Sequence, residues 1–342
     1  MKNTIPTQPK ILGGTLGSSA GAISAMLLSS ITYCKDIPHS LDTYIPEWKA
    51  VWLPTKSING QFAFIAFNGS QYAIAIRGSI LEFSIGSFDN WFRQDFNIFK
   101  QVDWEYTNNT TAKPRVSKGT ADALKNLIGL TDEKGDTIES FLMKNAIPNG
   151  TPLCITGHSL GAYLSTAFAP YLRYQIQKAN QPIPKVMSVF TFASPTAGNK
   201  AFAEEYDSLF PLSWRFYNQL DLIPFSASNI KGMANLFPPP GIAAKDVTYK
   251  NHNLSQAINL ISKTLAADEF IQHSHYSQTN LNRGSVALNK KNKIFDVKTT
   301  KPLEAWFKQV GAQHDHNAYL EFLGAPKLDY HLIKLQDDVK YT

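Results

Sequence analysis

The chain has 342 residues, of which 43% are hydrophobic, 12% aromatic and 18% charged. A chain of this length and apolar content buries a large core, which excludes disordered and fibrous proteins and fits one large α/β domain or two smaller ones. The net charge is only +6, and no basic stripe alternates with aromatic residues. We therefore expect no nucleic-acid partner.

The two cysteines, Cys34 and Cys154, predict free thiols rather than a disulfide scaffold. Residues 11–32 are uncharged, but glycine and serine dilute their apolar character and no A-x-A site follows, so we predict neither a cleaved signal peptide nor a membrane span. The compartment stays open between the cytoplasm and export without a recognisable cleaved signal. Residues 20–33 instead predict an amphipathic helix, with one side formed by Ile23, Met26, Leu27 and Ile31.

Two β-rich runs, residues 61–67 and 71–77, flank Asn68-Gly69-Ser70 and predict an antiparallel hairpin, because Asn-Gly supplies the positive φ angles of a tight turn. Further along, helical spacing marks residues 120–130, 137–146 and 162–178, and short apolar runs mark strands at 153–156, 186–193 and 214–217. Apolar strands that alternate with helices indicate an α/β fold with a mostly parallel sheet covered on both faces.

Residues 225–313 carry a weaker signal, which Pro238-Pro239-Pro240-Gly241 and the lysines near 290 interrupt. We interpret this region as an insertion or cap of uncertain structure. No repeat or linker divides the chain, so we expect a single domain over residues 1–342.

Gly157-His158-Ser159-Leu160-Gly161 lies where an apolar strand meets a helix, the context in which Gly-x-Ser-x-Gly forms a nucleophile elbow. The two glycines are needed because a Cβ at either position would collide where strand and helix cross. Ser159 is therefore the candidate nucleophile. We expect His158 to be packed beneath the sheet and to point away from the serine.

A serine hydroxyl needs a histidine to take its proton and an acid to orient that histidine. If the chain order is serine, acid, histidine, as in α/β-hydrolases, the best acid is Asp221, which follows the strand at 214–217 by one short turn. Spacing alone does not choose among the histidines that follow, which are His252, His273, His275, His314, His316 and His331.

With Ala162, the elbow resembles that of the class 3 lipase family, the fungal-type lipases and their bacterial and plant relatives. Other similar segments occur in the same order: Arg77-Gly78-Ser79, Asn90-Trp91 with Asp95, Phe192-Ala193-Ser194-Pro195 with Gly198-Asn199, and Asn218-x-x-Asp221-x-x-Pro224. Together they cover residues 77–224 and are far more specific than the elbow. One family feature is missing, since Val116-Ser117-Lys118-Gly119-Thr120 stands where many relatives carry a supporting histidine.

The resemblance implies an α/β-hydrolase fold with Ser159 as nucleophile and Asp221 as triad acid. A family ending in which the histidine precedes Tyr-Leu by five positions selects His314 as the base, whereas the register of the compact fungal members selects His316. The resemblance also implies an oxyanion hole built from the backbone amides of Ser79 and Leu160.

Residues 80–89 stand where the family places its lid, and they are unusually apolar for a solvent loop. A lid would turn these side chains toward lipid on opening, whereas the alternative is a loop docked into the core. The candidate contacts with lipid are Ile80, Leu81, Phe83, Ile85 and Phe88.

The implied activity is hydrolysis of acylglycerol esters through an acyl-enzyme, as in a triacylglycerol lipase, with no metal or organic cofactor. A phospholipase A1, a short-chain carboxylesterase and an acyltransferase use the same chemistry and stay open. From a different class, a non-catalytic lipid-binding protein could keep the same fold. The expected partners are an ester substrate and a lipid–water interface, and the oligomeric state stays open.

Overall fold

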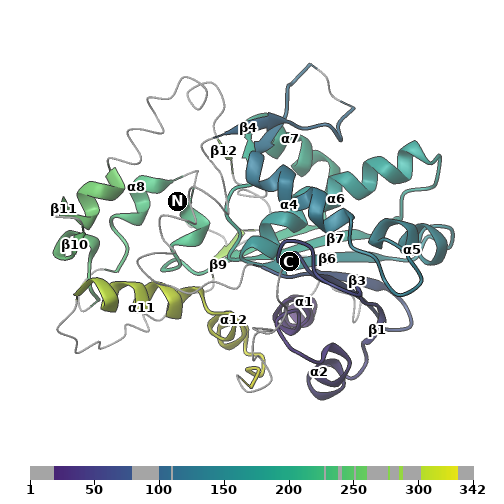
Figure 1. Ribbon diagram of the computed structural model, residues 1–342, viewed down its shortest axis with the longest axis horizontal. Helices are drawn as coiled ribbons and strands as arrows, with labels where there is room; N and C mark the ends of the chain where they lie inside the picture. The colour runs from purple at the N-terminus through teal and green to yellow at the C-terminus, as the bar shows by residue number, and fades with distance from the viewer. Residues whose placement is uncertain are drawn as a thin grey trace, which may run out of the picture.

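The computed structural model describes residues 19–78, 100–108, 111–226, 229–237, 241–249, 252–259, 276–277, 285–287 and 302–329. At its centre lies a seven-stranded sheet with the order β1-β2-β3-β6-β7-β9-β13 (Figure 1). Its strands are β1 Lys49–Trp52, β2 Ala63–Phe67, β3 Tyr72–Ile76, β6 Leu153–His158, β7 Met187–Phe192, β9 Ser213–Tyr217 and β13 Ser285–Ala287. The pairs from β3 to β13 are parallel, which confirms the predicted α/β-hydrolase arrangement.

The predicted hairpin is confirmed as β2 and β3, which pair antiparallel over five residues each. Its turn differs from the prediction in one respect, because only Gly69 has a positive φ (89°). Asn68 acts through its side chain instead: its Oδ1 accepts hydrogen bonds from the backbone N–H of Ser70 (3.1 Å) and of Gln71 (3.0 Å). Such a side-chain turn replaces the second left-handed residue.

Helices cover both faces of the sheet (Figure 1). One face carries α4 Lys118–Ile128, α5 Ile138–Asn145, α6 Leu160–Lys178 and α7 Lys200–Leu209, and the other carries α1 Ser19–Ile31, α2 Ile37–Tyr44 and α12 His316–Leu323. Side-chain caps fix where several of them begin. Ser117 caps α4, Thr137 caps α5 and Asn199 caps α7, each by accepting a backbone N–H three residues ahead.

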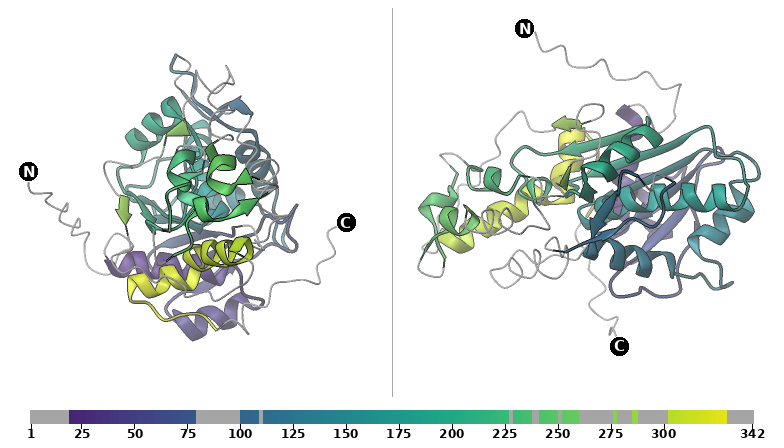
Figure 2. Two further views of the ribbon diagram at one scale, coloured as in Figure 1. Left: turned by 90° about the vertical axis from the view of Figure 1, so that its left-hand side faces the viewer. Right: turned by 90° about the horizontal axis from the view of Figure 1, so that it is seen from above.

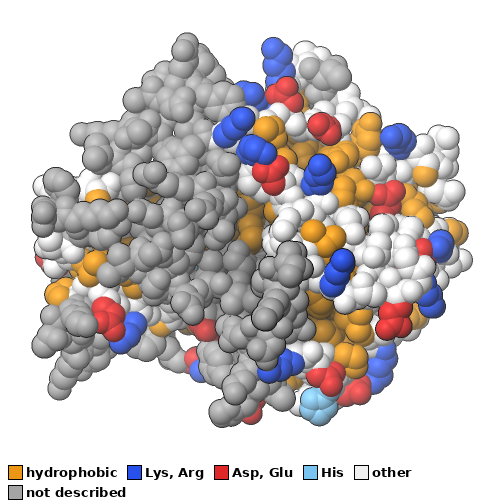
Figure 3. Space-filling model, viewed as in Figure 1, with side chains coloured by type: hydrophobic (Ala, Val, Ile, Leu, Met, Phe, Trp, Pro, Cys, Tyr) orange, Lys and Arg blue, Asp and Glu red, His pale blue; other side chains and the backbone are white. Residues whose placement is uncertain are grey.

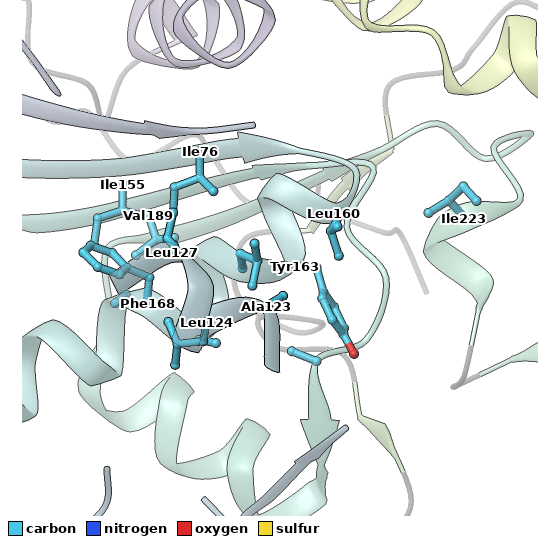
Figure 4. Close-up of a cluster of buried hydrophobic side chains, with 14 of the residues drawn as sticks. Ile76, Ala123, Leu124, Leu127, Ile155, Leu160, Tyr163, Phe168, Val189 and Ile223 are labelled. Carbon is cyan, nitrogen blue, oxygen red and sulfur yellow. The ribbon is translucent and has the colours of Figure 1, made fainter. Parts of the chain in front are cut away.

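A separate apolar core lies on each face of the sheet. On the α6 face, branched and aromatic side chains of the strands pack against α4 and α6, as Figure 4 shows for Ile155, Val189, Leu124 and Phe168. On the α1 face β3 and β6 carry the small residues Ala73, Ala75 and Cys154, whereas β7 and β9 carry aromatic ones. Small side chains let a helix backbone approach closely, which accounts for the position of α1.

Helix α1 is the helix predicted at residues 20–33, but it is not simply amphipathic. Besides the predicted side, Leu28, Ser29 and Ser30 are also buried. The helix lies between the sheet, α2 and α12, so that little of its circumference reaches solvent. Ser29 is accommodated because its hydroxyl lies 2.8 Å from that of Thr156 on β6.

A smaller sheet of order β12-β8-β5-β4 flanks the α6 face. Its strands are β4 Gln101–Asp103, β5 Arg115–Ser117, β8 Gly198–Asn199 and β12 Tyr276–Ser277.

In the region predicted as an insertion or cap, β13 joins the central sheet, and helix α11 Pro302–His314 leads the chain back to the edge of that sheet. At the start of this region and within it, the described elements include η2 Ile223–Phe225, α8 Ile230–Met233, η3 Ala244–Asp246, β10 Thr248–Tyr249 and β11 His252–Asn253. α8, β10 and β11, labelled in Figure 1, lie together at one end of the molecule, beyond the central sheet (Figure 2).

Both cysteines are buried and free, as predicted. Among the described residues, none of the helices is long and apolar enough to cross a membrane. On the face that Figure 3 displays, lysine and arginine side chains lie interspersed with aspartate and glutamate rather than gathered in one patch.

Candidate active site

The turn between β6 and α6 holds Ser159 in a strained conformation. Its φ is 58° and its ψ is −128°, a region that residues with a side chain rarely adopt. Ser159 follows directly on the last residue of the parallel strand β6 and precedes the first residue of α6. The turn therefore places the hydroxyl at the carboxyl edge of the sheet, where the loops of such folds build their sites.

The glycines of the elbow are required by space. A Cβ at Gly157 would lie 2.3 Å from the backbone carbon of Gly161. A Cβ at Gly161 would lie 2.1 Å from the carbonyl oxygen of Ile76 on β3. In both cases the obstacle is backbone, which does not move aside, and this confirms the reason given from the sequence.

The hydroxyl of Ser159 lies 2.8 Å from Nε2 of His314, at the end of α11. Nδ1 of the same ring lies 2.8 Å from Oδ2 of Asp221. A carboxylate only accepts hydrogen bonds, so Nδ1 carries the proton and Nε2 is left to accept from Ser159. The three side chains are 1%, 3% and 0% exposed, respectively, and form one buried hydrogen-bonded chain.

Asp221 follows β9, and its carboxylate accepts hydrogen bonds from two other groups besides His314. Its Oδ2 also accepts a hydrogen bond from the hydroxyl of Tyr319 (2.7 Å), and its Oδ1 accepts one from the backbone N–H of Ile223 (3.0 Å). Three donors thus fix the orientation of the carboxylate. Burial, together with the charge of Asp221, raises the pKa of Tyr319 well above its ordinary value, so that its hydroxyl stays neutral and keeps donating.

Asn218, the first residue of the acid motif, links the acid loop to the helix that bears the histidine. Its side-chain amide donates to the backbone carbonyl of Gln313 (3.0 Å) and to the Gln313 side chain (2.7 Å). Its backbone N–H donates to the Tyr319 hydroxyl (3.0 Å). Asn218 therefore fixes the residue directly before His314, a role that the spacing of the motif does not reveal.

Of the two histidines left open by the sequence, His314 is the one in contact with Ser159 and Asp221. His316 begins α12, and its ring stacks on Tyr33 with centroids 5.6 Å apart and planes 6° apart. His252 lies in β11, and His273, His275 and His331 lie outside the described residues.

His158 is packed, as predicted, but it belongs to the surroundings of the base. Its ring lies 4.8 Å from that of His314 and makes a hydrogen bond to the His314 backbone. Burial, and then the nearby charges of His314 and His316, lower the pKa of His158 well below its ordinary value. Burial likewise lowers the pKa of His316. Both rings are therefore neutral near pH 7.

The expected oxyanion donors are only partly within the described residues. Leu160 is the first residue of α6, and the first N–H groups of a helix have no carbonyl partner within it. Its N–H is adjacent to Ser159 by sequence. Ser79, the predicted lid residues Ile80, Leu81, Phe83, Ile85 and Phe88, and the segment from Asn90 to Asp95 lie outside the described residues.

Three residues at the site were not predicted to have a role. Tyr33 contacts the strand end before Ser79, Tyr319 contacts Asp221, and Arg215 on β9 donates to the carbonyl of Ser194 (2.8 Å) and to that of Pro224 (3.3 Å). In the sequence, Tyr319 only marked the spacing that selects His314, and its contact with Asp221 was not expected. Where relatives carry a supporting histidine, Ser117 caps α4 and hydrogen-bonds the hydroxyl of Tyr163.

Within the ranges that the structure describes, no group of three or more histidine, cysteine, aspartate or glutamate side chains could hold a metal ion. The arrangement of Ser159, His314 and Asp221 is chemically complete for moving one proton between a hydroxyl and an imidazole. Such a chain can activate the serine for attack on a carbonyl carbon.

Comparison with known proteins gives one family match. Residues 73–230 match the model of the family described as lipase (class 3), which confirms the resemblance seen in the motifs. The match includes the elbow and the acid loop and leaves out the segments of Tyr33 and His314. Among curated proteins, none matches the sequence.

Comparison with solved structures gives one likeness over most of the chain. The structure of M37 lipase has a TM-score of 0.68 and 22% identity, and the match covers 88% of this chain and 92% of that one. A Rhizomucor miehei lipase in complex with its propeptide has a TM-score of 0.46 and 21% identity, with 60% of this chain and 62% of that one covered. The Lip2 lipase of Yarrowia lipolytica has a TM-score of 0.45 and 18% identity, with 60% and 73% covered. At these identities the M37 likeness shows the shared fold.

Proposed function

We propose that the protein, a serine ester hydrolase related to the class 3 lipases over residues 73–230, cleaves acylglycerol esters at a lipid–water interface. The observation that carries the proposal is the buried chain from Ser159 through His314 to Asp221, with both contacts at 2.8 Å. We assign these residues as nucleophile, general base and orienting acid.

In the proposed reaction, Ser159 attacks the ester carbonyl while its proton passes to Nε2 of His314. The resulting imidazolium gives that proton to the departing alcohol, which leaves an acyl-enzyme. Water then attacks the acyl carbon, His314 takes the water's proton, and the same proton returns to Ser159 as the fatty acid leaves. Asp221 stays ionised and stabilises the imidazolium in both halves.

The negative charge on the carbonyl oxygen needs backbone donors in both halves. We assign this role to the amides of Leu160 and Ser79, as the motifs imply. Loss of one such donor typically costs about 100- to 1,000-fold in turnover. The site of the charge is next to the N-terminus of α6, whose dipole also favours an anion.

The test is hydrolysis of three substrates: a dissolved short-chain ester, an emulsified long-chain triacylglycerol, and phosphatidylcholine vesicles. We expect activity on the emulsion to exceed that on the dissolved ester. A preference for the vesicles would identify a phospholipase A1, and equal activity with no rise at the interface would identify a carboxylesterase. No hydrolysis of any ester would contradict the proposal and favour a lipid-binding protein.

Variants test the residue roles. Ser159→Ala and His314→Ala should each lower kcat by about 10⁴-fold or more, since members of a triad act as a unit. Ser165→Ala is the matched control, because Ser165 is a buried serine of α6, six positions after Ser159, whose hydroxyl donates to the Gly161 carbonyl (2.8 Å). Activity lost in the His316→Ala variant but kept in His314→Ala would show that the base is assigned to the wrong histidine.

A further inference from the structure

Tyr33 contacts the end of β3 through Gly78, and its ring lies against His158 of the elbow. It follows α1, which precedes the family match over residues 73–230, and no sequence motif includes it. We propose that Tyr33 is a positioning residue: its hydroxyl holds the backbone of Gly78 against the elbow, one position before the proposed oxyanion donor Ser79. This inference rests on the proposed function, because it assumes that an oxyanion forms there.

The direct contact is a hydrogen bond from the backbone N–H of Gly78 to the Tyr33 hydroxyl, at 3.1 Å. Gly78 comes just after β3 and just before Ser79. A glycine has no Cβ to restrict its backbone, so an outside contact is needed to hold it in one conformation. The Tyr33 hydroxyl, which accepts the Gly78 N–H, supplies this contact although the two residues are 45 positions apart in the sequence.

The space around Gly78 shows how closely this contact joins the nucleophile. A Cβ at Gly78 would lie 2.4 Å from the Tyr33 hydroxyl oxygen, 2.6 Å from the carbonyl oxygen of His158 and 3.2 Å from Cβ of Ser159. The phenol, the elbow and the end of β3 therefore meet around one point. A shift of the Gly78 backbone would therefore change its position relative to Ser159.

Tyr33 is itself held at its backbone and at its ring. The backbone N–H of Tyr33 donates to the Ser30 carbonyl (3.1 Å) at the end of α1. The ring stacks on His316 and meets the edge of His158 at 6.5 Å and 72°. Burial raises the pKa of Tyr33, so the hydroxyl stays neutral and remains an acceptor for Gly78.

Tyr33→Phe tests the proposal, because phenylalanine keeps the stack on His316 and removes only the hydroxyl. On a dissolved ester we expect kcat to fall about five- to tenfold, the effect of one hydrogen bond, with KM changed less than about twofold. Affinity for an alkylboronic acid, which forms a tetrahedral adduct on the serine, should fall by a similar factor. The pH at half-maximal kcat should not move, because the base is untouched.

Tyr206→Phe is the matched control for loss of a buried phenol hydroxyl. Tyr206 is 1% exposed and bonds Ser213 Oγ (2.8 Å) at the start of β9, the opposite edge from the elbow. We expect this variant to lower the melting temperature without changing kcat. Equal kcat for wild type and a folded Tyr33→Phe, an equal loss in both variants, or a shifted pH midpoint in Tyr33→Phe would each overturn the proposal. Should wild type and Ser159→Ala behave alike, the proposed function itself has failed.

Discussion

At Gly161 the main chains of α6 and β3 approach each other so closely that a methyl group has no room. The three nearest atoms to an added Cβ are the Ile76 carbonyl oxygen at 2.1 Å, the Arg77 carbonyl carbon at 2.8 Å and the Gly78 nitrogen at 2.8 Å. All three belong to the strand end that leads to Ser79. Gly161 therefore sets the distance between the elbow and the end of β3.

We expect Gly161→Ala to lower the free energy of unfolding by about 3 kcal/mol, the upper part of the range for overpacking, and to reduce kcat at least as much as Tyr33→Phe does. Urea unfolding and ester kinetics measure the two effects. Gly135→Ala is the control, since Gly135 has a φ of 78° but no atom within 4 Å of an added Cβ. It should cost about 1–2 kcal/mol from backbone strain and leave kcat unchanged.

Some residues of the site are readable from the sequence because local geometry dictates their type. Ser159 needs its flanking glycines, and Asp221 follows a strand by one turn. The choice between His314 and His316 is of a different kind, because the two lie only two positions apart and the sequence shows no recognisable strand just before them. Tyr33 is further from prediction still, since only the folded chain brings it to Gly78.

At the scale of elements, the loops after β7 and β9 are joined by a buried arginine. Arg215 on β9 is 2% exposed, and one terminal nitrogen donates to the carbonyls of both Ser194 and Pro224. Burial lowers the pKa of Arg215 to about 10, so the side chain is still charged at pH 7 and needs those carbonyls. Pro224 ends the acid motif, so this contact also supports the position of Asp221.

We expect Arg215→Lys to destabilise the protein by about 3–5 kcal/mol, because lysine lacks the planar fork and leaves a buried charge with fewer partners. The urea midpoint and slope measure this. Arg173→Lys, at a half-buried arginine in the second half of α6, is the control and should change stability by less than about 0.5 kcal/mol. Equal effects would show that the link between the loops contributes little.

Elements with long apolar runs were predictable, and short or edge elements were not. β2, β3, β6 and β7 each carry enough consecutive apolar residues to be recognised, and β9 carries three aromatic residues around Arg215. β4 and β13 have three residues each, and β13 becomes a strand because β9 pairs with it. Helix α11 follows a region in which lysines interrupt the pattern, so its amphipathic spacing did not stand out.

For the whole molecule, two neutral buried histidines make stability depend on pH. Burial lowers the pKa of both His158 and His316 in the folded protein. In the unfolded chain a histidine takes up a proton near pH 6.5. Below that pH the unfolded state binds more protons than the folded state, so stability falls as pH falls.

Between pH 7.5 and pH 5 we expect the free energy of unfolding to decrease, with His158 contributing up to about 1.4 kcal/mol per pH unit below pH 6 and His316 contributing less. Urea unfolding at several pH values measures the slope. His158→Gln should remove the larger part of it, whereas His39→Gln, on the exposed side of α2, should leave it unchanged. A slope that is the same in all three proteins would contradict this origin.

The proposed triad joins residues that are far apart along the chain: His314 lies 155 positions after Ser159 and 93 after Asp221. During synthesis at about 5–20 residues per second, roughly 8 to 30 seconds pass between the addition of the serine and that of the histidine. A nascent chain can form the elbow well before it has a base. The unfinished chain therefore lacks the proposed base, and we expect ester hydrolysis to begin only after α11 has emerged from the ribosome and docked.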